Sequence, residues 1–164
     1  MIHNDPSMEA DQISALQATW RKRGIDASKG CSPDVIRQFE RNTAVSLTTL
    51  IRSYLLLSDG MAISDGRDFD DLGFSFWPLR QWTTASDELA QQGEESVEPW
   101  LQKAFVFADY MTRSWSYAVY LGHEVAEKYG AVFRIGSPGV EECAPSFEAF
   151  LQLYLENSRL LYGE

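Results

Sequence analysis

The residues most suggestive of metal chemistry are His123 and Glu124, which begin the run His123-Glu124-Val125-Ala126-Glu127. In the zinc-protease pattern His-Glu-x-x-His, two histidines one helical turn apart bind zinc and the glutamate activates a water molecule. Here Glu127 occupies the position of the second histidine, and His3 is the only other histidine in the chain. The segment therefore predicts a solvated loop or helical turn rather than a zinc site.

A second chemical candidate is the acidic loop that contains Asp65, Asp68, Asp70 and Asp71. Carboxylate oxygens suit a hard cation, but an EF-hand loop ends in a glutamate, and the corresponding position counted from Asp68 is Leu79. We therefore predict no specific metal site and no cofactor. The sequence favours a solvated acidic loop, and weak adventitious binding of a cation is the alternative.

A serine nucleophile is not indicated either. Ser137 lies between Gly136 and Pro138, and the proline lacks the backbone N–H that an oxyanion hole commonly uses. No glycine-rich dinucleotide fingerprint and no phosphate-binding loop occurs in the sequence. The sequence therefore predicts turn chemistry at Ser137 and no set of catalytic residues.

The strongest structural signal is the stretch Phe105–Leu121, where two aromatic-rich segments flank a polar tip. Side chains alternate with a period of two on both sides of the tip, which predicts two strands joined as a hairpin. Asp109, Arg113 and Ser114 lie at or beside the tip. They are either ordinary turn residues or part of a binding surface, because loops are exposed and polar in both cases.

The composition of the 164-residue chain fits one globular unit, with 45% hydrophobic and 13% aromatic residues. The formal net charge of -10 disfavours binding to nucleic acid or to anionic membranes, because phosphate binding requires lysine and arginine. The N-terminus lacks the pattern of a signal peptide, so we expect a cytoplasmic protein. Cys31 and Cys143 are far apart in sequence, and we expect free thiols.

Helices are predicted by capping residues that precede apolar residues at helical spacing. Ser32-Pro33-Asp34 is a strong start, because serine caps, proline fits the first helical position and aspartate complements the helix dipole. The other predicted helices begin near Ser7, Ser46, Ser86 and Ser146.

Strands are predicted at Phe74–Trp77, on both sides of the hairpin tip, and at Ala131–Ile135. Helices first, then several short strands, then one terminal helix imply an α+β fold. We expect a mainly antiparallel sheet packed against N-terminal helices and a C-terminal helix.

The order of these features resembles the SUKH superfamily, which includes yeast cell-wall-synthesis regulators and bacterial toxin-immunity proteins. The residues that carry the resemblance are LTTLIRSYLLLSDG, FSFWPLRQW, FVFADYMTRSWSYAVYL, YGAVFRIG and APSFEAFLQLYLE. It covers about Ser32 to Asn157 and suggests an N-terminal extension (1–31) that forms one compact unit with a SUKH-like domain (32–164). Two departures are Thr48, where the family often has proline, and Arg113-Ser114-Trp115, in place of a glycine-rich tip.

The resemblance implies a binding module without catalytic residues, commonly an immunity protein that occludes a toxin. We expect a protein partner, with a basic toxin domain as the candidate, and make no prediction of the oligomeric state. The candidate contacts are Asp65, Asp68, Asp70, Asp71, Asp109, Arg113 and Trp115. The alternatives are a small hydrolase or metal-dependent enzyme around Asp109, His123 and Glu124, and a regulatory scaffold whose partner is not a toxin.

Overall fold

The computed structural model describes residues 6–63, 66–94, 98–136 and 139–163. Its α-helices are α1 (Pro6–Lys22), α2 (Pro33–Thr43), α3 (Thr49–Leu57), α4 (Ala85–Gln91) and α5 (Phe147–Leu155). Its strands are β1 (Phe74–Phe76), β2 (Thr83–Thr84), β3 (Ala104–Tyr110), β4 (Trp115–Tyr120), β5 (Val132–Gly136) and β6 (Gly139–Ala144). Short 3₁₀ helices are η1 (Leu79–Gln81), η2 (Pro99–Lys103), η3 (Ala126–Lys128) and η4 (Arg159–Tyr162).

All strands belong to one antiparallel sheet with the order β1-β3-β4-β5-β6, and β2 also pairs with β3. The short strands β1 and β2 therefore follow one another along the same edge of β3. The predicted hairpin is confirmed as β3 and β4, and the α+β fold class is confirmed with it. β6 was not predicted, because this edge strand exposes Glu141 and Glu142 and lacks an apolar alternation.

Serine and threonine side chains cap the helices by accepting backbone N–H groups. Ser32 accepts from Val35 at the start of α2 and Ser146 accepts from Ala149 at the start of α5, as predicted. The other three helices begin within three residues of their predicted starts, but the predicted serines do not cap them. Ser7 lies inside α1, Thr48 rather than Ser46 caps α3, and Thr84 rather than Ser86 caps α4.

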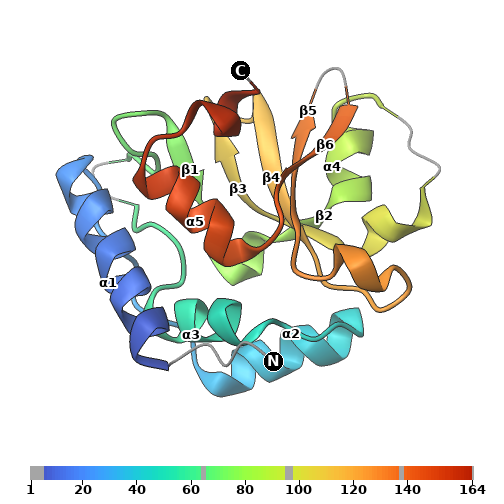
Figure 1. Cartoon of the computed structure of the whole chain (residues 1–164), viewed down its shortest axis with the longest axis horizontal. Helices are drawn as coiled ribbons and strands as arrows, with labels where there is room; N and C mark the ends of the chain where they lie inside the picture. Colours follow the sequence, from blue (N-terminus) through green and yellow to red (C-terminus); the bar gives the residue numbers. More distant parts are fainter. Residues whose placement is uncertain (1–5, 64–65, 95–97, 137–138, 164) are drawn as a thin grey trace.

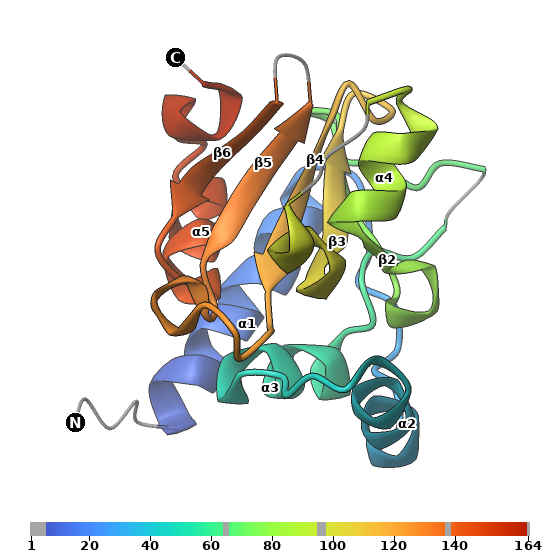
Figure 2. The same cartoon turned by 90° about the vertical axis from the view of Figure 1, so that its right-hand side faces the viewer.

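The helices cover the sheet from two sides and at one end. In Figures 1 and 2, α5 lies on one face and α4 on the other, while α2 and α3 lie across the lower end. α1 packs beside α5 and α3 through Ile13, Leu16 and Trp20, whose side chains are fully buried. The predicted N-terminal extension thus contributes directly to the hydrophobic core.

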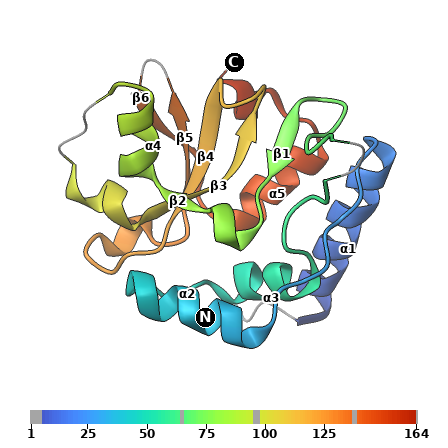
Figure 3. The ribbon, with the colours of Figure 1, turned by 180° about the vertical axis from the view of Figure 1, so that it is seen from behind.

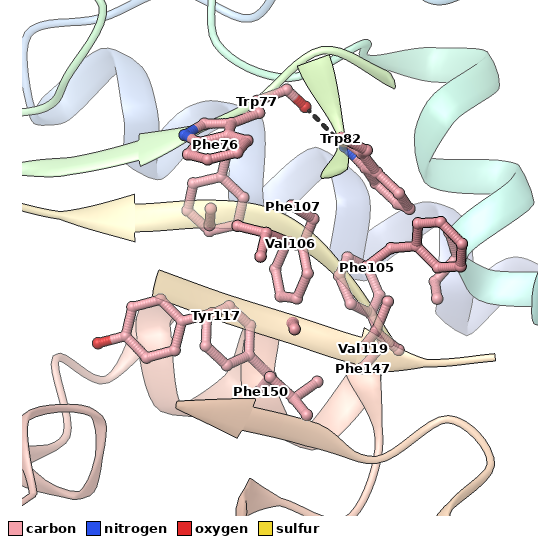
Figure 4. Close-up of a cluster of buried hydrophobic side chains, with 14 of the residues drawn as sticks. Phe76, Trp77, Trp82, Phe105, Val106, Phe107, Tyr117, Val119, Phe147 and Phe150 are labelled. Carbon is pink, nitrogen blue, oxygen red and sulfur yellow. Dashed lines mark hydrogen bonds between the residues drawn. The ribbon is translucent and has the colours of Figure 1, made fainter. Parts of the chain in front are cut away.

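Aromatic side chains fill the space between the sheet and α5 (Figure 4). Phe107 of β3 contacts Phe147 and Phe150 of α5, with ring centroids 5.2 and 5.1 Å apart. Phe150 is fully buried, and truncation of such a ring to alanine typically costs about 3–5 kcal/mol. None of the described helices has the length and apolar character needed to cross a bilayer.

Candidate partner-binding site

The tip of the β3–β4 hairpin lies at the end of the sheet opposite α2 and α3 (Figure 3). Met111, Thr112 and Arg113 follow one another there with φ angles of 50°, 53° and 65°. Left-handed backbone costs an ordinary residue roughly 1–2 kcal/mol, so three in succession require support from neighbouring groups.

Hydrogen bonds to backbone atoms and to the side chains of Asp109 and Ser114 supply that support. At the base of the tip, Ser114 N–H donates to the Tyr110 carbonyl over 3.0 Å, and Ser114 Oγ donates to the Met111 carbonyl over 2.9 Å. Met111 N–H donates to the Gly73 carbonyl over 2.9 Å, which ties the tip to the loop before β1. Finally, Arg113 N–H donates to Asp109 Oδ1 over 3.2 Å.

A hollow of about 190 Å³ lies where the tip meets β1 and the acidic loop. Ser75 of β1 and Asp109 of β3 are cross-strand partners in its wall. The residues lining it are Asp68, Phe69, Ser75, Trp77, Gln81, Asp109, Thr112 and Arg113. A neighbouring hollow of about 230 Å³ shares Asp68, Ser75 and Gln81 with it.

Asp109 is a buried carboxylate in this wall, with 7% of its surface exposed. Its Oδ2 accepts from Trp77 Nε1 over 2.6 Å, while Oδ1 accepts from the Arg113 backbone. Burial raises the pKa of Asp109 above its usual value, and the two hydrogen bonds and the Arg113 charge oppose that rise. Its visible role is to hold Trp77 and the hairpin tip together.

Arg113 extends over the hollow with its side chain about half exposed. Its guanidinium carbon lies 4.8 Å from the centre of a Trp77 ring, and Nη1 donates to Gln91 Oε1 over 3.3 Å. Arg113 Nε is also 4.0 Å from Oε1 of Glu88, a buried carboxylate that accepts from Ser116 Oγ over 3.0 Å. Arg113 therefore places a cation beside two buried carboxylates and an aromatic ring.

Asp70 points into the core instead, with 1% of its surface exposed. Its Oδ1 accepts from the backbone N–H groups of Leu72 and Phe74 over 2.8 and 3.0 Å. Its Oδ2 accepts from the Tyr154 hydroxyl over 2.5 Å and lies 3.9 Å from Arg23 Nη1. Asp70 thereby joins the loop before β1 to α5 and to the residue that follows α1.

The remaining predicted contacts are spread around the tip. Asp68 and Asp71 are exposed, and Asp71 forms an ion pair with Arg67 over 2.6 Å. Trp115 is half-buried, and its Nε1 donates to the Tyr117 hydroxyl over 2.8 Å. Because strand side chains alternate, Trp115 lies on the sheet face opposite that of its neighbour Ser116. The structure therefore brings Asp68, Asp109 and Arg113 together.

Two exposed apolar residues were not predicted as contacts: Phe69, which lines the hollow, and Met111, which precedes the lining residue Thr112. Phe69 exposes 43% of its surface and Met111 exposes 56%. Large apolar side chains in an acidic loop and at a hairpin tip were the available signal, because such positions normally carry polar residues.

The proposed enzyme residues are not brought together. Asp109 lies at the tip, whereas His123 and Glu124 follow the other end of β4, beyond Tyr120. Ser116 of β4 pairs with Asp109 across the sheet. From Ser116 to Tyr120, β4 extends by about 13 Å, and His123 and Glu124 come after that. His123 stacks on Tyr129, and Glu124 accepts from the Tyr120 hydroxyl over 3.2 Å. Within the ranges that the structure describes, no three His, Cys, Asp or Glu side chains form a metal-binding group.

Three residues considered from the sequence lie outside the described residues: His3, Asp65 and Ser137.

Comparison with protein families gives one match, in which the model of the SMI1 / KNR4 family (SUKH-1) covers residues 30–153. No curated protein matches the chain. The match includes every strand and all of α2, α3 and α4, and it begins after α1.

Proposed function

The chain belongs to the SMI1/KNR4 family (SUKH-1), and from this membership we propose that it is a non-enzymatic protein-binding domain. Its proposed role is that of an immunity protein, which binds a bacterial toxin and blocks the toxin's activity. SUKH domains are commonly immunity proteins, and this tendency supports the proposal.

The observation that carries the proposal is the combination of side chains at the hairpin tip. Phe69 and Met111 offer exposed apolar surface, while Asp68 and Arg113 offer charges beside it. Interface energy is concentrated in aromatic and arginine side chains, surrounded by polar groups that exclude water. A rigid hairpin tip that presents these groups suits recognition of another protein.

The acidic character of the chain supports a basic partner. A net charge of -10 attracts a positively charged protein over a distance and raises the association rate at low salt. The proposed contacts are Asp68 and Asp71 in the acidic loop, Arg113 at the tip, and Trp115 at its base. A specific interface buries about 800 Å² on each partner, so these residues supply its centre and neighbouring surface completes it.

The test is protection of bacterial cells that express the toxin encoded beside the gene for this chain. Co-expression of the wild-type chain is expected to restore growth. Met111→Ala and the double variant Arg113→Ala, Trp115→Ala are expected to reduce protection at equal protein levels. Met8→Ala is the matched control, because Met8 is similarly exposed, at 66%, but lies on α1.

Two outcomes count against the proposal. Failure of the wild-type chain to protect would favour a regulatory scaffold with another kind of partner. Full protection by the double variant, together with Met111→Ala behaving like Met8→Ala, would remove the hairpin tip from the interface.

A further inference from the structure

A larger hollow, of about 500 Å³, lies on the α4 side of the sheet and, among the residues that the structure describes, shares no lining residue with the hollow at the hairpin tip. In Figure 2, α4 stands over this face of the sheet in front of β3 and β4, with β5 and β6 beyond β4. The residues lining the hollow are Leu89, Glu94, Glu98, Trp100, Leu101, Lys128, Phe133, Gly139, Val140 and Glu142. Its volume is in the range of sites that bind small molecules or single side chains.

Two aromatic rings form its floor. Trp100 of η2 and Phe133 of β5 have ring centroids 4.7 Å apart. The ammonium of Lys128 lies over both rings, 4.8 Å from the centre of Trp100 and 5.3 Å from the centre of Phe133. Cations within about 6 Å of an aromatic ring centre are attracted by its negative face. This floor therefore already holds one organic cation, supplied by the chain itself.

Carboxylates surround that floor. Glu142 is the cross-strand partner of Phe133, so both side chains lie on the same face of the sheet. The adjacent Glu141 points to the other face and pairs with Arg134 over 2.6 Å. With Glu94 and Glu98, the lining residues that the structure describes carry three carboxylates and one ammonium, that of Lys128, which gives a formal charge of -2. The hollow as a whole therefore attracts cations despite its resident lysine.

We propose that this hollow binds a basic side chain of the protein partner, preferably the guanidinium of an arginine. The inference rests on the proposed function for the source of that side chain. A guanidinium stacks on aromatic rings and forms paired hydrogen bonds with carboxylates, and Trp100, Phe133 and Glu142 provide both partners. Leu89, Leu101 and Val140 provide the apolar wall that an arginine stem requires.

Lys128 acts in this site as a competitor. Its ammonium occupies the aromatic floor in the free protein, and an incoming guanidinium must displace it or accept a like charge nearby. Lys128→Met keeps most of the stem and removes the charge. This variant is expected to bind the basic side chain more tightly by about threefold or more.

The experiment is a titration of the full-length chain with a blocked Gly-Arg-Gly peptide, followed by NMR. The indole N–H signal of Trp100 is expected to move, with an affinity about tenfold higher than for the same peptide carrying uncharged citrulline. Glu142→Gln is expected to weaken binding severalfold. Glu127→Gln removes the same charge from an exposed position outside the lining, so it serves as the matched control.

Equal affinity for the arginine and citrulline peptides would overturn the inference. So would equal weakening by Glu142→Gln and Glu127→Gln, because binding would then follow overall charge and not the hollow. No toxin is present in this titration. A negative result therefore refutes arginine binding in the hollow and leaves the proposed function standing. The protection assay with Met111→Ala tests only whether the hairpin tip contacts the toxin.

Discussion

Replacing Asp70 by alanine is expected to destabilise the whole protein, although Asp70 lies in a loop of exposed acidic residues. The substitution removes the acceptor of three hydrogen bonds, from Leu72 N–H, Phe74 N–H and the Tyr154 hydroxyl. It also leaves Arg23, whose side chain is 14% exposed, without its carboxylate partner. Loss of one member of a buried ion pair typically costs about 3–5 kcal/mol.

That cost is a large fraction of the roughly 5–15 kcal/mol that stabilises an ordinary domain. For a chain of this length, each kcal/mol lowers the melting temperature by about 2–4 °C. Asp70→Ala is therefore expected to lower it by about 6–20 °C. Asp68→Ala is the control, because it removes the same charge from an exposed position in the same loop and is expected to change stability by about 0.5 kcal/mol or less.

Both variants are measured by urea unfolding followed by far-UV circular dichroism and tryptophan fluorescence, and by thermal melting. A double-mutant cycle with Arg23→Ala isolates the contribution of the ion pair. Melting temperatures of Asp70→Ala and Asp68→Ala within about 2 °C of each other would show that the hydrogen bonds and ion pair of Asp70 do not stabilise the fold.

Three further predictions concern other buried groups. Gly60→Ala is expected to cost about 2–4 kcal/mol in urea unfolding, because φ is +76° and the new Cβ would lie 2.6 Å from a backbone carbonyl oxygen. Gly66→Ala, with φ +77° and open space around it, is expected to cost only about 1–2 kcal/mol, and an equal cost at both sites would refute the steric argument. Burial raises the pKa of Asp109, so folding favours the protonated form of this carboxyl. The stability that it contributes is therefore present at low pH and is lost as pH rises through the pKa of Asp109 in the folded protein. The stability of Asp109→Asn relative to wild type is thus expected to increase between pH 3 and pH 7, and a pH-independent difference would contradict this. Burial raises the pKa of Cys31 to about 11 and that of Cys143 to about 12. Because the thiolate is the reactive form, Cys31 is expected to react with iodoacetamide at pH 8 roughly a hundredfold more slowly than glutathione, and Cys143 roughly a thousandfold more slowly.

The fold was largely predictable because its central elements carry strong periodic patterns. Alternation in Phe105–Leu121 identified the hairpin, and the stripe that includes Phe147, Phe150 and Tyr154 identified the last helix. β6 was missed because neither of its faces is consistently buried: the adjacent Glu141 and Glu142 are both exposed, so no apolar residue recurs with a period of two. The starts of α3 and α4 were misplaced because several hydroxyl residues precede each helix, and tertiary contacts decide which one caps.

The candidate contacts remain a prediction, but the structure shows that the sequence did not distinguish the buried from the exposed members of the set. Asp68 and Asp70 have the same side chain and are two positions apart, yet one is exposed and the other is 1% exposed. No periodicity in an irregular loop distinguishes them, because the difference depends on Tyr154, more than eighty positions away. Trp77 was treated only as a strand residue, although its indole N–H holds Asp109 in place.

The backbone conformation of the hairpin tip determines which of its residues can be substituted without changing the loop. The hydrogen bonds that hold Met111, Thr112 and Arg113 involve backbone atoms and the side chains of Asp109 and Ser114. The shape of the loop is therefore set without the side chains of Met111 and Thr112, which are exposed, whereas the Arg113 side chain also contacts Trp77 and Gln91. Substitutions at Met111 and Thr112 are therefore expected to change the surface of the tip without requiring a new loop conformation.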